Sequence, residues 1–293
     1  MLHAKVTGGA RTAMVQNFVT TPTARWSAKI CAMSVSGILA VCLYSKAMPL
    51  IGGIDGTQLA LIVFGAAAVS SIGGFAFSAL CGAALFHTNM DHVQVVQTML
   101  ISSTSIQLLM IMTVWKMIDW LRLCQFAIGG LIGVPLGLFV LLHVERHLFA
   151  SGVGALLCAY STYMILRRPF VVPRRMERLD LLVGFAGGIT GGAVAFPGAP
   201  VTAWCQLRGW TRDQQRGIYQ PFILAMQIVS LTFMALLSKD GGRLELSFNH
   251  VMSVPPALVG ALIGIYIYHK CTDRIFLIIV NATLFFSGLT LLF

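Results

Sequence analysis

Long runs of apolar residues, separated by short polar stretches, make up most of the chain. A helix needs ~20 such residues to cross a hydrocarbon core about 30 Å thick, and most of the runs have that length. The pattern therefore predicts an all-α, polytopic membrane protein. The apolar runs occupy residues 30–48, 57–87, 93–115, 123–142, 148–166, 181–207, 217–238, 248–268 and 275–293.

Two of these runs are longer than a single span and are interrupted by glycine and proline. The run at 57–87 contains Gly73-Gly74, and the run at 181–207 contains several glycines followed by Pro197-Gly198-Ala199-Pro200. Glycine inside a helix costs about 1 kcal/mol, and an internal proline removes a backbone hydrogen bond. We therefore do not expect a continuous helix through either run.

The few charged residues bear on the class of protein. Only 10% of the residues are charged and 57% are hydrophobic, whereas the surface of a soluble domain needs about 25% charged residues. The composition excludes an ordinary soluble protein. The net charge of +10 is explained by cytoplasmic loops, where basic residues accumulate, so no nucleic-acid partner is expected.

The positions of the basic residues indicate how the runs lie in the membrane. If all nine runs cross, the 20 Lys and Arg divide evenly between the two sides. If the two broken runs return to the side from which they enter, only Lys46, Arg146, Lys239 and Arg243 lie outside. We therefore predict seven full spans and two re-entrant helical hairpins, in the cell (inner) membrane, with a cytoplasmic N-terminus.

The same topology contains an internal repeat. After an extra N-terminal helix, each half has a broken re-entrant segment followed by three transmembrane helices, and the halves begin on opposite sides. Gly73-Gly74 matches Gly187-Gly188, and Gly133-xxx-Gly137 matches Gly260-xxx-Gly264. Two inverted repeats with discontinuous helices are typical of secondary transporters.

This organisation divides the chain into five parts. The basic tail contains no acidic residue, which also fits an organelle transit peptide, although we interpret it as a cytoplasmic tail. The parts are the tail at 1–28, the extra transmembrane helix and loop at 29–56, the first transporter repeat at 57–166, an Arg/Pro-rich cytoplasmic linker at 167–180 and the second transporter repeat at 181–293.

The chemistry available inside the spans favours an anion. All acidic and basic side chains lie in loops or at the ends of runs, which disfavours cation transport because intramembrane carboxylates usually mark cation pathways. Interrupted helices instead leave backbone N–H groups and the positive ends of helix dipoles, which bind anions. We find no motif for nucleophilic catalysis, zinc or phosphate binding, so we expect no enzyme, metal or cofactor.

We expect the anion to be held at the two breaks, with hydroxyl and amide groups on neighbouring helices completing the site. Ser103 and Gln107 in the first half are expected to face Gln220 and Gln227 in the second. Each hydroxyl has an alternative, a hydrogen bond to a carbonyl of its own helix. The predicted substrate-binding residues are Ser71, Gly73, Gly74, Thr98, Ser102, Thr190, Gly191, Gly192, Pro197, Gly198, Thr202 and Gln220.

The histidines are assigned no such role. His87 and His92 flank Asn89 and Asp91 at the end of a run, where they fit either a proton-passing group or a solvated loop. His250 is placed at a membrane interface.

Several of these motifs resemble the sulfite exporter family named for TauE and SafE. The residues from Gly187 to Leu231, which begin GGITGGAVAFPGAPV, are similar to the glycine-rich break and PGPPV pattern of its second half. GGFAF at Gly73 and VVQTML at Val95 are similar to its first half. The resemblance covers about residues 60–293. Gln97 departs from it by replacing a glycine.

The resemblance implies secondary transport of sulfur-containing anions such as sulfite, sulfoacetate or other organosulfonates. The residues alone indicate an anion transporter that works by alternating access, in which the two halves rock around a central site. Two alternatives stay open, namely a transporter of other organic anions and a non-transporting scaffold or assembly subunit whose glycine-rich helices bind partner helices. The expected partners are a small sulfur-containing anion and the lipid bilayer, and a homodimer is left open.

Overall fold

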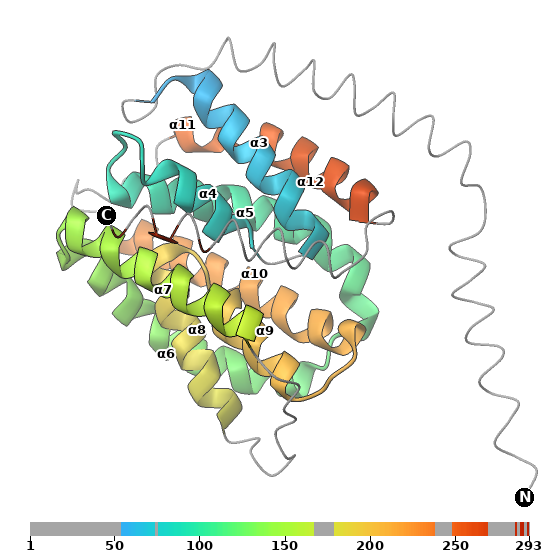
Figure 1. Ribbon diagram of the computed structural model, residues 1–293. Helices are drawn as coiled ribbons and strands as arrows, with labels where there is room; N and C mark the ends of the chain where they lie inside the picture. The colour runs from blue at the N-terminus through green and yellow to red at the C-terminus, as the bar shows by residue number, and fades with distance from the viewer. Residues whose placement is uncertain are drawn as a thin grey trace, which may run out of the picture. The chain divides into compact units, whose positions relative to one another are not determined.

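The computed structural model describes residues 54–73, 76–166, 179–237 and 248–268, with a few isolated residues near the C-terminus. Every regular element in these ranges is a helix (Figure 1), which confirms the all-α prediction. The N-terminal tail, most of the extra helix and linker, and most of the last run lie outside the described residues. The elements are α3 (Gly56–Gly73), α4 (Phe77–Leu85), α5 (His92–Val114), the 3-10 helix η1 (Trp115–Met117), α6 (Trp120–His143), α7 (Arg146–Leu166), α8 (Leu179–Val194), α9 (Gly198–Leu207), α10 (Arg212–Leu237), α11 (Phe248–Val251) and α12 (Val254–Tyr268).

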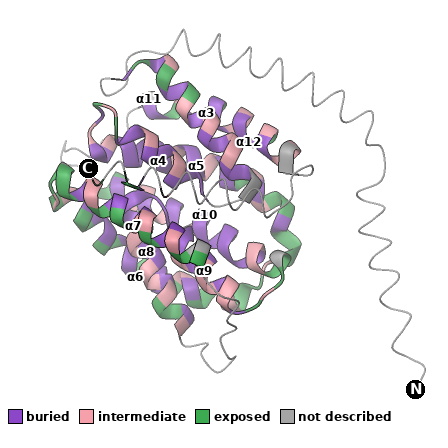
Figure 2. Cartoon of the chain, in the orientation of Figure 1, coloured by how far each residue is buried: buried purple, intermediate pink, exposed green. Residues whose placement is uncertain are grey.

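The helices carry apolar side chains on their exposed surfaces. In the described part of the chain, three helices are long and apolar enough to cross a membrane, at His92–Met117, Trp120–His143 and Asp213–Leu237. Figure 2 shows exposed residues along α6, and these include Leu121 and Phe139. Large apolar side chains in such number on the outside indicate contact with lipid. The chain is therefore a membrane protein.

Both interrupted runs fold as two helices each. Helix α3 ends at Gly73 before α4 begins at Phe77, and α8 ends at Val194 before α9 begins at Gly198. The glycines of α8 do not interrupt it. Its break falls three residues later, where Ala195 has φ 54° and where the ring of Pro197 prevents a helical hydrogen bond.

The second broken segment turns back on itself. In α9, the indole nitrogen of Trp204 donates to Asp180 in the first turn of α8, at 2.6 Å. An apolar groove of about 360 Å³ is lined by both helices, including Leu179 and Ala186 of α8 and Pro200 and Leu207 of α9, together with Tyr163 of α7. The two arms are thus antiparallel, which is the geometry that a re-entrant hairpin requires.

Helices α6 and α8 pack with their backbones in contact. A Cβ atom on Gly133 of α6 would overlap the carbonyl oxygen of Phe185, and one on Gly188 of α8 would overlap that of Gly130. Only glycine permits helices to approach so closely. We call this contact the α6–α8 seam. Its other glycines are Gly129, Gly137, Gly184 and Gly192.

Helices α3 and α12 form a matching contact, the α3–α12 seam. A Cβ atom on Gly260 would overlap the carbonyl oxygen of Phe64, and one on Gly264 would overlap that of Ala68. Figure 1 shows α3 beside α12 and α6 beside α8. Each broken segment therefore packs on a helix from the other half of the chain. Two equivalent halves would produce this reciprocal packing.

The two seams give a different register from the one predicted between the halves. Under the predicted match of Gly133 with Gly260, the contacts of Gly133 with Phe185 and of Gly260 with Phe64 make Phe64 the counterpart of Phe185. On that register Gly73 is the counterpart of Val194, and both end their helices. The predicted match of Gly73-Gly74 with Gly187-Gly188 stays a prediction with another register. Of that second pair, Gly188 lies on the α6–α8 seam, whereas Gly187 faces Phe222 and Pro197.

The run at 248–268 is also divided, into α11 and α12. Pro255 and Pro256 occupy the first turn of α12, where proline is tolerated because the N–H groups there have no helical partner. Proline also disfavours helical backbone in the residue before it. These two prolines therefore explain why α12 starts afresh.

Candidate functional site

The two broken segments meet at a small cavity. Ser78 in the first turn of α4 lines it together with Val194 and Phe196 at the second break. Helix α7 closes one side with Leu157, and the ring of its Tyr160 lies 5.9 Å from that of Phe196. The volume is about 10 Å³, which is room for roughly one water molecule. The cavity thus lies between the second break and the helix that follows the first.

Both short helices that follow the breaks start without a side-chain cap. Among the described residues, no side chain accepts from the first N–H groups of α4, whose N-cap is Ala76, or of α9, whose N-cap is Pro197. Gly198 is the buried first residue of α9. At the end of α8, in contrast, the N–H groups of Ala195 and Phe196 donate to carbonyls of α8. The donors left at the breaks belong to the starts of α4 and α9.

Three predicted residues hold buried polar atoms that no other described residue satisfies. They are the hydroxyl of Ser71 at the end of α3, the hydroxyl of Thr202 in α9 and the amide oxygen of Gln220 in α10. A buried polar atom without a partner costs about 1–3 kcal/mol. Ser71 also lies on the α3–α12 seam, where its Cβ faces Gly264. Bound water or a ligand would satisfy these groups.

Thr98 and Ser102 lie in a different cluster, against α11 and the start of α12. The Thr98 hydroxyl is 2.9 Å from Nδ1 of His250, and the Ser102 hydroxyl is 2.6 Å from that of Ser253. Thr98 donates to Gln94 and Ser253 donates to the His250 carbonyl. It follows that His250 donates to Thr98 and Ser102 donates to Ser253. All four protons are engaged, so this cluster offers no free donor to an anion in this conformation.

The remaining predicted residues lie along α8 and its break. Thr190 donates to carbonyls of its own helix at 3.2 Å, which is the alternative role of such hydroxyls. A Cβ atom on Gly191 would lie 3.0 Å from Cβ of Pro197, and Gly192 packs on Val134 of α6. These two glycines shape the hairpin, and Gly74 lies outside the described residues.

A polar contact joins the two long helices α5 and α10. The side-chain amide of Gln227 donates to the Ser103 hydroxyl at 2.6 Å, which confirms that these predicted residues face one another. Ser230, one turn further along α10, is buried, and no described residue bonds its hydroxyl. Ser230 and His250 were not predicted as site residues. Ser230 could have been identified from the sequence, because it lies three residues after Gln227 and therefore on the same helix face. His250 becomes a candidate only through its contact with Thr98.

One acidic side chain is more deeply buried than its place at the end of a run suggested. Asp180 has no exposed surface, and it lies at the base of the α8–α9 hairpin with Trp204. Arg208, only 7% exposed, stacks over Trp204 and Trp210, and Arg122 stacks over Trp210. This cluster lies at the base of the hairpin, at the opposite end of α8 from the break.

Comparison with known proteins gives one match. The model of the family described as sulfite exporter TauE/SafE matches residues 59–291. The chain belongs to the TauE/SafE family. No curated protein and no solved structure matches it.

Membership of the TauE/SafE family agrees with the resemblance over about residues 60–293. Its members are membrane transporters rather than enzymes. Within the described ranges, no group of three His, Cys, Asp or Glu side chains could hold a metal ion.

Proposed function

We propose that the protein is a secondary transporter of small sulfur-containing anions, with sulfite or an organosulfonate such as sulfoacetate as the substrate. The observation that carries the proposal is the small cavity shared by the two broken segments, which Ser78 lines together with Val194 and Phe196. The nearby starts of α4 and α9 present N–H groups and the positive ends of two helix dipoles. Such a site holds an anion without a charged side chain.

The hydroxyl groups without partners complete this proposal. A sulfonate has three oxygen atoms that accept hydrogen bonds, and Ser71 and Thr202 each keep a buried hydroxyl without a described partner. In a dry site such donors are worth more than in water. We assign Gln220 a second role, in orienting bound water or a protonated group, because the atom it leaves unpartnered is an acceptor.

The seams change which parts would move during alternating access. The α6–α8 seam joins a helix of the first half to the broken segment of the second half. The α3–α12 seam joins the broken segment of the first half to a helix of the second half. Backbone contacts of this kind cannot slide without steric overlap. We propose that the moving units are α6 with α8–α9 and α12 with α3–α4, in place of the two halves of the sequence.

The cavity suits a closed state of such a cycle. Its volume of about 10 Å³ does not admit a sulfonate, so the two units would have to separate on one side to load the anion. Separation would widen the cavity that Ser78 and Phe196 line while each glycine seam stays intact. This motion exposes the site to one side at a time.

Flux through the purified protein tests the function. We expect protein in liposomes to carry radiolabelled sulfoacetate or sulfite, and Gly198→Leu to abolish this flux while the variant still inserts and purifies. The added side chain would fill the start of α9, where the anion is proposed to bind. A folded protein that carries neither anion contradicts the proposal.

The same assay addresses the alternatives. Competition by non-sulfur organic anions, with no effect of sulfite or sulfoacetate, would favour a transporter of other organic anions. The scaffold alternative has lost its main support, because the described Gly-xxx-Gly pairs pack within the chain and are not available to partner helices. A cell (inner) membrane location, a cytoplasmic N-terminus and a homodimer remain part of the proposal.

A further inference from the structure

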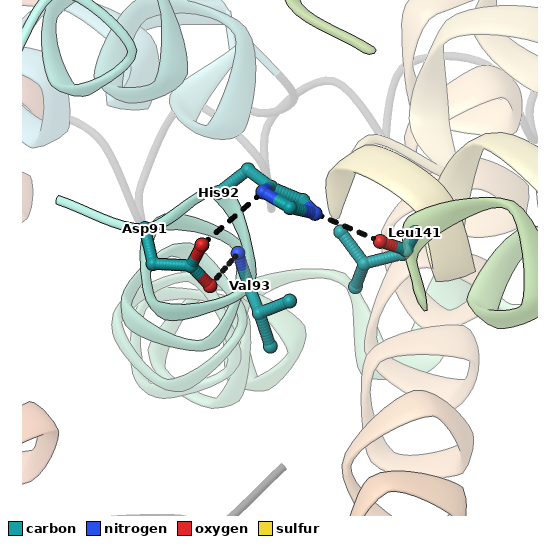
Figure 3. Close-up of polar contacts among 4 residues, drawn as sticks. All are labelled: Asp91, His92, Val93 and Leu141. Atoms are coloured by element: carbon teal, nitrogen blue, oxygen red, sulfur yellow. Dashed lines mark hydrogen bonds and ion pairs between the residues drawn. The ribbon is translucent and has the colours of Figure 1, made fainter. Parts of the chain in front are cut away.

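The imidazole of His92, the first residue of α5, lies between two oxygen atoms (Figure 3). Its Nε2 is 3.0 Å from the carbonyl oxygen of Leu141, and its Nδ1 is 3.3 Å from Oδ1 of Asp91. The residue is 6% exposed. The Nδ1 contact is at ion-pair distance but lacks the angles of a hydrogen bond. His92 is therefore a buried side chain with an acceptor on either side.

The number of protons on this imidazole follows from its neighbours. A carbonyl oxygen only accepts, so Nε2 must carry a proton to bond Leu141. In the neutral ring Nδ1 then has a lone pair, and that lone pair would face the carboxylate of Asp91. A further proton, on Nδ1 or on Asp91, turns this repulsion into an attraction. The geometry therefore accommodates a further proton between Nδ1 and the Asp91 carboxylate.

The surroundings hold both partners in place. Oδ2 of Asp91 accepts the N–H of Val93 at 3.1 Å and so caps α5. The Leu141 carbonyl is in the last turn of α6, where carbonyls lack helical partners and the dipole favours a cation. Phe149 of α7 covers the ring, with centroids 5.4 Å apart, and itself contacts Phe86.

Asp91 is the one titratable side chain in contact with this imidazole among the described residues. Helix α6 faces it with a backbone carbonyl, and α7 faces it with an aromatic ring. The other titratable side chains described at these helix ends are exposed, namely His87, His143, Glu145 and His147. A further proton on this imidazole would thus be shared with Asp91.

The contact also crosses between the two units that we propose to move. We assign α5 to the unit of α12 with α3–α4, because it packs on α12 and on α4, where Met99 lies against Gly82. Helix α6 is fixed to the second hairpin through the α6–α8 seam. The hydrogen bond from His92 to Leu141 therefore joins the two units. Loss of the extra proton would weaken the interaction of Asp91 with the imidazole of His92. This would favour separation of the two units.

We propose that His92 and Asp91 form a proton-binding site that couples anion transport to the proton gradient. The proposal rests on the transport function proposed above. The proton is bound while α5 and α6 are joined and is released when they separate. With one proton moved per anion, a gradient of one pH unit adds about 1.4 kcal/mol, or roughly tenfold anion accumulation.

Sulfoacetate uptake into proteoliposomes tests this coupling, in a pH range where both of its acidic groups stay ionised. We measure the ratio of uptake with a pH gradient to uptake without one. The ratio is expected to be several-fold for the unchanged protein and to fall to unity in His92→Gln, which can donate to Leu141 but takes up no proton. Asp91→Asn should also lower it, because asparagine keeps the cap of α5 but removes the carboxylate.

His143→Gln is the matched control, because this exposed histidine bonds only the Phe139 carbonyl of its own helix and its ratio should not change. A ratio unchanged in both His92→Gln and Asp91→Asn overturns the proposal. So does sulfoacetate or sulfite flux in the unchanged protein that ignores the pH gradient. Absence of any flux instead contradicts the transport function itself, and the coupling with it.

Discussion

Trp204 in α9 donates a hydrogen bond to Asp180 at the start of α8, with 2.6 Å between Nε1 and Oδ1. These residues are 24 positions apart. A continuous helix of that length would separate them by about 36 Å, which is more than the thickness of the hydrocarbon core. The bond therefore returns the chain to the level at which α8 begins, as a re-entrant segment requires.

The first prediction concerns the sidedness of the loops. If both broken segments return, the loop before α5 and the loop before α10 lie on opposite sides of the membrane. Asn89 is exposed in the first of these loops, and Gln214 is exposed in the first turn of α10, directly after the second. We expect a single cysteine at Asn89 to react with a membrane-impermeant maleimide in intact cells, and one at Gln214 to react only after permeabilisation.

Each position is the control for the other, in a background whose native cysteines are replaced. Labelling of both positions from outside would mean that the α8–α9 segment crosses the membrane. Labelling of Gln214 alone from outside would mean either that the first broken segment crosses or that the N-terminus lies outside.

The second prediction concerns the base of the hairpin. Trp204→Phe keeps most of the aromatic packing, including that with Arg208, but removes a hydrogen bond to a carboxylate that has no exposed surface. We expect the free energy of unfolding to fall by about 1–3 kcal/mol. Trp120→Phe is the control, because Trp120 is an exposed residue at the start of α6. Equal melting temperatures for the two variants in detergent would show that the bond contributes little.

The third prediction separates binding from stability at the proposed site. The Thr202 hydroxyl is buried without a described partner, so Thr202→Val removes an unsatisfied group and should leave the melting temperature unchanged or raise it. If this hydroxyl donates to the anion, the KM for sulfoacetate should rise about tenfold, which corresponds to roughly 1.4 kcal/mol of lost binding.

Thr104→Val is the matched control, because the Thr104 hydroxyl donates to the carbonyl of Leu100 in its own helix at 2.6 Å. Its KM should stay as in the unchanged protein. A lower melting temperature for Thr202→Val with an unchanged KM would assign Thr202 a structural role in place of a binding one.

The interrupted runs could be predicted because proline and glycine act locally. Pro197 cannot donate to the helix before it, whatever packs around it, and the break occurs within three residues of it. The exact end of α8 could not be predicted. Ala195 adopts φ 54°, a conformation that alanine disfavours, so tertiary contacts must impose it.

The roles of the glycines depended on partners that sequence spacing does not identify. Gly188 and Gly191 are three residues apart, yet the first meets the backbone of Gly130 and the second meets Pro197. The site shows the same limit. Thr98 and Thr202 are both buried threonines on apolar helices. The structure shows that the Thr98 hydroxyl is engaged by the Gln94 carbonyl and by His250, whereas that of Thr202 has no described partner.

The fourth prediction tests the α6–α8 seam. A Cβ atom on Gly188 would overlap the backbone of Gly130, and backbone cannot rotate away as a side chain can. Gly188→Ala must therefore push the helices apart, at a cost of about 1–3 kcal/mol or more. We expect a lower yield of monodisperse protein and a lower melting temperature. Gly152→Ala in α7 is the control, because nothing lies within 4 Å of a Cβ there and alanine stabilises a helix by about 1 kcal/mol relative to glycine. If Gly188→Ala were as stable as Gly152→Ala, the seam would be compliant, and the proposal that α6 moves as one unit with the α8–α9 hairpin would lose its physical basis.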